Sequence, residues 1–82
     1  MKFESITDIK NFMKTIYDSV KCNDKYCDDL IWYSKANYSI STEYYGDVKN
    51  FIEEIIDEPA FIRYKSDLSQ LLMQLNKLFR QK

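Results

Sequence analysis

A single proline, Pro59, separates two stretches whose apolar residues recur at helical spacing, and this arrangement constrains the fold most. Proline disfavours the helical conformation for the residue before it and suits the first position of a helix. We therefore expect one amphipathic helix over 47–57 and a second over 59–80. Their apolar faces are Val48, Phe51, Ile52, Ile55 and Ile56 in the first, and Phe61, Tyr64, Leu68, Leu71, Leu72, Leu75, Leu78 and Phe79 in the second.

The first half of the chain also shows helical spacing. A helix is predicted over 6–21, where Ser5 or Thr7 can cap the N-terminus. A further helix is predicted over 25–36. The sequence contains one glycine and one proline, which argues against a turn-rich β-sandwich or barrel. The apolar stripe of the first helix is Ile9, Phe12, Met13, Ile16 and Val20.

Residues 37–46 fit two secondary structures. Their apolar and aromatic side chains alternate, which would suit a strand paired with 30–34. An isolated hairpin is marginally stable, and this favours helix. The helix over 47–57 has Asp47 as a good N-cap, or it begins near Thr42 with Gly46 inside it. The predicted fold is all-α, a compact antiparallel bundle of about four helices in a single domain of residues 1–82. The alternative is three helices plus a short β-hairpin near 30–45.

Composition limits the possible chemistry. The net charge is −1 and histidine is absent, whereas nucleic-acid-binding domains are usually strongly basic. The sequence has no Ser–His or Cys–His pair and no glycine-rich phosphate loop. We therefore expect a protein that is not an enzyme and has no cofactor or metal.

The cysteines and the hydropathy pattern predict a location. Cys22 and Cys27 are the only cysteines, and the N-terminus lacks the apolar segment of a signal peptide. We expect reduced thiols in a cytoplasmic protein. No apolar run is long enough to span a membrane.

Charge is segregated along the chain. Residues 42–58 carry six carboxylates against Lys49, a net charge of −5, and residues 59–82 carry five basic residues against Asp67, a net charge of +4. The carboxylates could pair locally with Arg63 and Lys65, or they could form a docking face for a basic partner. The basic residues are spread around the last helix, so a nucleic-acid interface is a poor alternative.

Five aromatic residues fall within 31–46. Such residues are either core or contact surface, and Trp32 with about half of the tyrosines is expected to be at least partly buried. The leucine face of 59–80 suits a core, with a homodimer as the alternative, so the protein is a monomer or a homodimer. The candidate partner-binding residues are Tyr33, Tyr38, Glu43, Tyr44, Tyr45, Asp47, Glu54 and Asp57.

Residues 31–79 resemble small α-helical bacterial immunity proteins of the bacteriocin or contact-dependent growth inhibition type. The resemblance lies in the aromatic segment, in DVKNFIEEI and in DLSQLLMQLNKLF. Tyr44 and Tyr45 with Glu43 and Asp47 are similar to the tyrosine pair and acidic residues of colicin-type nuclease inhibitors. The resemblance implies a tight stoichiometric inhibitor of a basic toxin or nuclease. Alternatives are a phage-encoded inhibitor of a host defence protein and a homo-oligomeric regulatory or structural protein.

Overall fold

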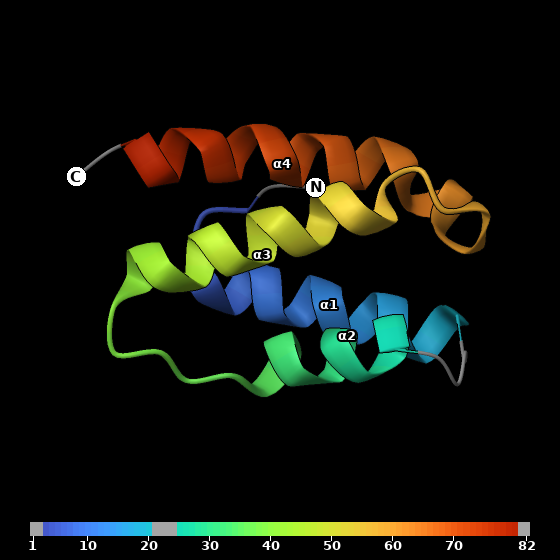
Figure 1. Cartoon of the computed structure of the whole chain (residues 1–82), viewed down its shortest axis with the longest axis horizontal. Coiled ribbons are helices and arrows are strands. Elements are labelled where there is room, and N and C mark those ends of the chain that lie inside the picture. The colour runs from blue at the N-terminus through green and yellow to red at the C-terminus, as the bar shows by residue number, and fades with distance from the viewer. Residues whose placement is uncertain (1–2, 21–24, 81–82) are drawn as a thin grey trace. The chain divides into compact units, whose positions relative to one another are not determined.

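The computed structural model describes residues 3–20 and 25–80, and every regular element among them is a helix (Figure 1). The all-α prediction is confirmed. The β-hairpin alternative is wrong, because α2 continues to Lys35 and a new helix begins at Ser41. The elements are α1 (Ile6–Val20), α2 (Lys25–Lys35), α3 (Ser41–Ile55), the 3-10 helix η1 (Pro59–Tyr64) and α4 (Lys65–Arg80).

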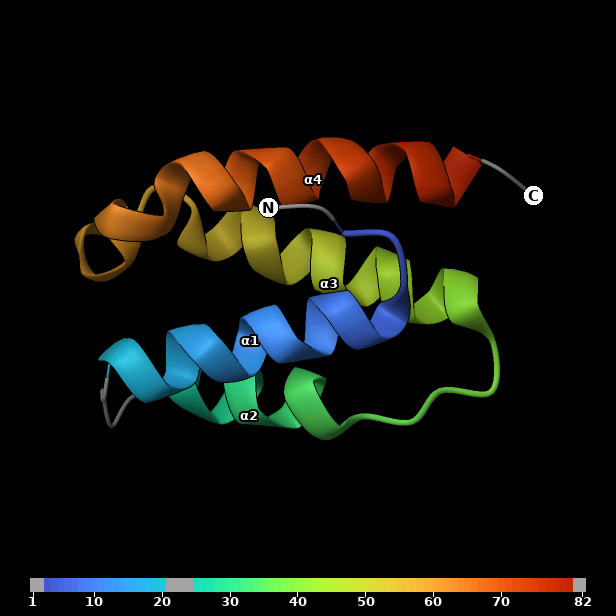
Figure 2. The same ribbon diagram turned by 180° about the vertical axis from the view of Figure 1, so that it is seen from behind.

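The backbone contacts divide the chain into two helical hairpins. One extends to residue 37 and contains α1 and α2, and the other begins at residue 38 and contains α3, η1 and α4. Within each hairpin the two long helices run antiparallel, as the views from both sides show (Figures 1 and 2). The single domain over 1–82 remains a prediction.

Helix α1 begins at a reciprocal cap. The Ser5 Oγ atom accepts a hydrogen bond from the Asp8 N–H at 3.3 Å. In return, Asp8 Oδ2 accepts from the N–H groups of Ser5 at 3.2 Å and Glu4 at 2.9 Å. This is a capping box, which satisfies N–H groups that a helix start otherwise leaves free. Ser5 is therefore the cap, and Thr7 is not. Lys21, the predicted last residue of this helix, lies outside the described residues.

The buried side chains of the first hairpin come mainly from α1. Phe3 packs against Phe12 with ring centroids 5.1 Å apart. Among the described side chains of α2, only Cys27 and Leu30 are buried. Cys27 is disulfide-bonded, so the expectation of a reduced thiol is wrong for this residue. The buried set is Phe3, Ile9, Phe12, Met13, Ile16, Cys27, Leu30 and Ala36.

Helix α3 begins at Ser41, six residues before the preferred start at Asp47. The alternative start near Thr42, with Gly46 inside the helix, is the observed arrangement. Ile40 precedes the helix in an extended conformation. The longer helix places Tyr44 one turn before Val48 on its buried side, and this burial offsets the cost of about 1 kcal/mol for glycine within a helix.

Pro59 opens a 3-10 helix rather than an α-helix, so the prediction of one continuous helix over 59–80 is wrong for its first six residues. The Glu58 N–H donates to the Ile55 carbonyl at the end of α3, and Glu58 itself is extended, as expected before proline. Short 3-10 segments are common at the start of α-helices. In this one the Phe61 side chain is fully buried.

The leucine face of α4 is core. Leu68, Leu71 and Leu75 have no exposed surface. Leu72 and Leu78, on the same predicted face, are half-buried. The choice between monomer and homodimer stays a prediction. None of the helices in the described ranges has the length and apolar character needed to cross a bilayer.

Candidate functional site

The structure places seven of the eight predicted site residues in the hairpin that begins at residue 38. Tyr33 belongs to α2, in the other hairpin, where it is half-buried. The remaining residues fall on α3 or beside it, and they occupy different sides of that helix. The candidate site is therefore narrower than the sequence predicted.

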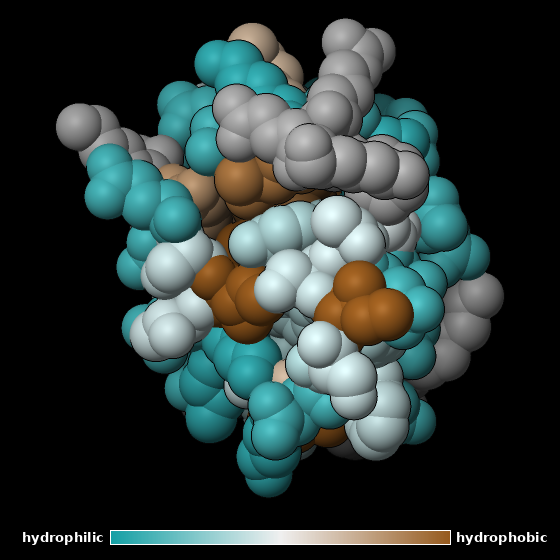
Figure 3. All heavy atoms as spheres, turned by 90° about the vertical axis from the view of Figure 1, so that its left-hand side faces the viewer, coloured by the Kyte–Doolittle hydropathy of each residue, from teal (hydrophilic) through white to brown (hydrophobic). Residues whose placement is uncertain are grey.

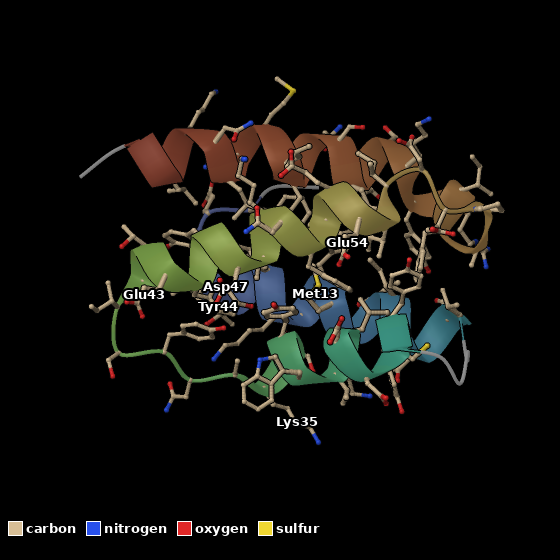
Figure 4. The ribbon with its side chains drawn as sticks, in the orientation of Figure 1. Met13, Lys35, Glu43, Tyr44, Asp47 and Glu54 are labelled. Atoms are coloured by element: carbon tan, nitrogen blue, oxygen red, sulfur yellow. The ribbon has the colours of Figure 1, made fainter. Side chains whose placement is uncertain are left out.

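The outer side of α3 carries a row of exposed polar residues, which we call the acidic face: Glu43, Asp47, Asn50 and Glu54. These positions follow the spacing i, i+4, i+7, i+11, so they lie along one side of the helix. Figure 4 shows the three carboxylates distributed from the start of α3 to near its end. The sequence predicted all three as site residues, and the structure brings them onto one face.

Asp47 is the carboxylate on this face that is held in place by a side chain. The Tyr38 hydroxyl donates a hydrogen bond to Asp47 Oδ2 at 2.8 Å. The Tyr38 ring packs edge-on against Tyr44, with centroids 5.3 Å apart. Tyr44 is 1% exposed, so its ring is fixed in the core. This ring orients Tyr38, and Tyr38 in turn orients the Asp47 carboxylate. Tyr38 is half-buried, and it lies at the border of the acidic face.

Tyr44 and Tyr45 do not add exposed aromatic area to the acidic face. Tyr44 is part of the core. Tyr45 is half-buried, and its ring centroid lies 6.3 Å from that of Tyr44. Residues two apart on a helix do not share a side, so Tyr45 points away from Asp47. Among the four predicted tyrosines, Tyr38 is hydrogen-bonded to a carboxylate of the acidic face, that of Asp47.

The carboxylates near the end of α3 have mixed roles. Asp57 pairs with Lys65 at 3.5 Å, and both side chains are largely exposed. Lys49 pairs with Glu53 at 3.4 Å across one helical turn. Local pairing therefore accounts for Asp57, although an exposed pair of this kind contributes little to stability. Among the described residues, Glu43 and Glu54 form no ion pair.

Sequence reasoning did not identify Trp32 as a surface residue. Its side chain is 59% exposed on α2. The sequence holds a signal for this position, because Asp28 and Lys35 stand four residues before it and three after it, on the same side of the helix. Both of these charged residues are exposed.

The acidic face can bind positive charge. Carboxylates and a phenol accept hydrogen bonds from lysine and arginine side chains. Within residues 3–20 and 25–80, no group of three or more His, Cys, Asp or Glu residues is placed to hold a metal ion. The face of the molecule in Figure 3 shows apolar side chains as small separate spots among hydrophilic ones.

No known protein family model, curated protein or solved structure matches this chain.

Proposed function

We propose that this protein is a small non-catalytic inhibitor that binds a basic protein partner through the acidic face of α3. The immunity function is part of this proposal: the partner is a bacterial toxin or nuclease, neutralised by stoichiometric binding. One observation carries it. Three exposed carboxylates share one side of a helix, and Tyr38 orients the central one from the edge of that side.

The dipole of α3 favours Glu43 in its first turn, but other features of the carboxylate arrangement do not stabilise the helix. Glu43 and Asp47 are like charges one turn apart, which destabilises a helix by a few tenths of a kcal/mol. Glu53 and Glu54 lie in the last turn, where the helix dipole disfavours negative charge, and this turn contains no basic residue. Residues that break local stability rules are often retained for function.

The link between Tyr38 and Asp47 supports binding in a second way. A carboxylate that is already oriented loses less conformational freedom when a partner binds, so more of the interaction energy appears as affinity. A half-buried tyrosine also offers rigid apolar area with a polar tip, which is common at interface hot spots. In this proposal Tyr38 provides the anchor, while Glu43 and Glu54 accelerate the encounter.

Two alternative functions use the same surface differently. A phage-encoded inhibitor of a host defence protein would bind its target by the same chemistry. A homo-oligomeric regulatory protein would have to associate without the buried leucines of α4. The acidic face favours a basic partner over a second copy of this chain, since two identical acidic surfaces repel each other.

The cytoplasmic location remains a prediction, and the disulfide at Cys27 argues against it. Disulfides persist in oxidising compartments and are rare in the reducing cytosol. The bond therefore favours a location outside the reducing cytosol for the oxidised form.

The test is binding between the purified protein and the product of each gene next to its own. Isothermal titration calorimetry should give one-to-one binding below micromolar concentration, and the complex should lack the toxic or nuclease activity of the free partner. The proposal fails if none of the purified neighbours binds below micromolar concentration. If the protein binds a partner without reducing that partner's activity, the protein is a binding module but not an inhibitor.

A further inference from the structure

Ile40 occupies the N-cap position of α3, where most helices carry a polar residue. It adopts an extended conformation and makes no side-chain capping hydrogen bond. Serine, aspartate and asparagine cap a helix best, whereas isoleucine is among the poorest residues at this position. Serines stand on both sides of it in the sequence, at Ser39 and Ser41. The start of α3 is therefore less stable than a serine at position 40 would make it.

The Ile40 side chain does not recover this loss by packing into the core. It is 53% exposed, whereas Tyr44, one helical turn later, is 1% exposed. A single exposed isoleucine is ordinary on a protein surface. At this position, however, the residue gives up a helix cap and buries little apolar area in return. Residues that break local stability rules in this way are often retained for function.

The backbone around Ile40 is held to α3 at two points. The Ile40 carbonyl accepts hydrogen bonds from the N–H groups of Glu43 at 3.2 Å and Tyr44 at 3.4 Å. Two residues earlier, the Tyr38 ring packs on Tyr44 and its hydroxyl donates to Asp47. A fixed segment therefore presents the exposed isoleucine, and a partner that covers it orders little additional backbone.

Ile40 adjoins the acidic face. Glu43 follows it by three residues and Asp47 by seven, so they lie roughly 5 and 10 Å further along the helix axis. Both carboxylates are exposed, and Figure 4 shows them in the first turns of α3. Residues 36–48 contain no lysine or arginine that could neutralise them. A partner side chain that covers Ile40 is therefore favoured when cations accompany it.

We propose that Ile40 is the apolar contact of the partner-binding surface, and that it selects a partner segment in which an apolar side chain lies beside lysines or arginines. This inference rests on the proposed function and narrows the chemistry of the partner. A segment of lysines alone would pair with the carboxylates but leave Ile40 uncovered. The apolar contact slows dissociation, while the carboxylates accelerate the encounter.

The first experiment asks whether Ile40 serves the fold. The variant Ile40→Ser supplies a capping hydroxyl, so we expect Tm to rise by about 4 °C in thermal unfolding followed by circular dichroism. An isoleucine kept for core packing would have the opposite effect. A fall in Tm would therefore overturn the proposal, because stability would then explain the residue.

The second experiment measures binding of two synthetic lysine-rich peptides, one with a central leucine and one with serine in its place. NMR titration of the wild-type protein should show the leucine peptide binding about fivefold or more tightly, as expected for partly burying one leucine. Ile40→Ser should remove this preference. The matched control Ile62→Ser should keep it, since Ile62 is 64% exposed on η1, beyond the other end of α3.

Equal affinity of the two peptides for the wild-type protein would overturn the inference and leave the proposed function standing, because charge alone would then account for binding. Loss of the preference in Ile62→Ser as well would overturn it, since the leucine would not be recognised at Ile40. Absence of binding by both peptides at about 1 mM would also overturn it. The titrations with the neighbouring gene products decide the proposed function separately.

Discussion

Tyr38 connects the segment before α3 to the helix through a ring contact with Tyr44 and a hydrogen bond to Asp47. Replacing Tyr38 by phenylalanine keeps the ring contact and removes the hydrogen bond. We expect Tyr38→Phe to lower the free energy of unfolding by about 1 kcal/mol, the usual net value of one such bond. Urea denaturation followed by circular dichroism measures this, and the slope of the transition should stay unchanged.

The matched control for this substitution is Tyr17→Phe. Tyr17 is half-buried on α1, its ring faces the Lys14 ammonium at 5.6 Å, and its hydroxyl has no hydrogen-bond partner among the described residues. Removal of the Tyr17 hydroxyl should change the free energy of unfolding by less than about 0.5 kcal/mol. Equal effects of the two substitutions would mean that the hydrogen bond to Asp47 contributes nothing measurable.

Gly46 is a second residue whose effect on stability can be measured by one substitution, because it occupies the interior of α3. Its position is half-buried and lies off the buried side of the helix. We expect Gly46→Ala to stabilise the protein by about 1 kcal/mol, since alanine loses less backbone freedom in a helix. Thermal unfolding would show this as a rise of roughly 4–8 °C in Tm. A lower Tm would show that the methyl group does not fit at this position.

At the level of elements, η1 contributes one buried side chain, Phe61, to the connection between α3 and α4. Phe61 has no exposed surface, while its neighbour Ile62 is 64% exposed. Truncating a fully buried phenylalanine typically costs about 3–5 kcal/mol. We therefore expect Phe61→Ala to destabilise the protein severely and Ile62→Ala to change stability by less than about 0.5 kcal/mol. Chemical denaturation of the two variants compares them directly, and similar losses would contradict the burial pattern.

The same elements show which features the sequence could predict. The apolar spacing of α1, α3 and α4 predicted helices and their buried sides, because periodic burial leaves a periodic pattern. The start of α3 was ambiguous, since Tyr44 fits a strand alternation as well as the helical stripe and Gly46 favours a break. The 3-10 form of η1 left no mark that distinguishes it from the first turns of an α-helix.

The sequence predicted the candidate site in part, as it predicted the helices in part. The carboxylates of the acidic face share a helical side by spacing alone. The tyrosines could not be sorted in the same way, because aromatic residues serve equally as core and as surface. Tyr44 and Tyr45 are adjacent in the sequence, yet one is buried and the other is not. The sequence pattern alone does not separate these roles.

For the whole molecule, the position of the negative charges should affect the rate of association with a partner more than the net charge does. Changing Glu43, Asp47 and Glu54 to their amides removes three negative charges from the acidic face. We expect association with the identified basic partner to slow by about tenfold or more at low salt, because steering by opposite charge is lost, and to become less sensitive to ionic strength. Surface plasmon resonance at several salt concentrations measures both the association rate and its dependence on ionic strength.

The matched control neutralises Glu4, Asp18 and Asp28, an equal change in net charge that leaves α3 intact. If both triple variants slow association equally, net charge alone governs the encounter, and the acidic face has no special part in it.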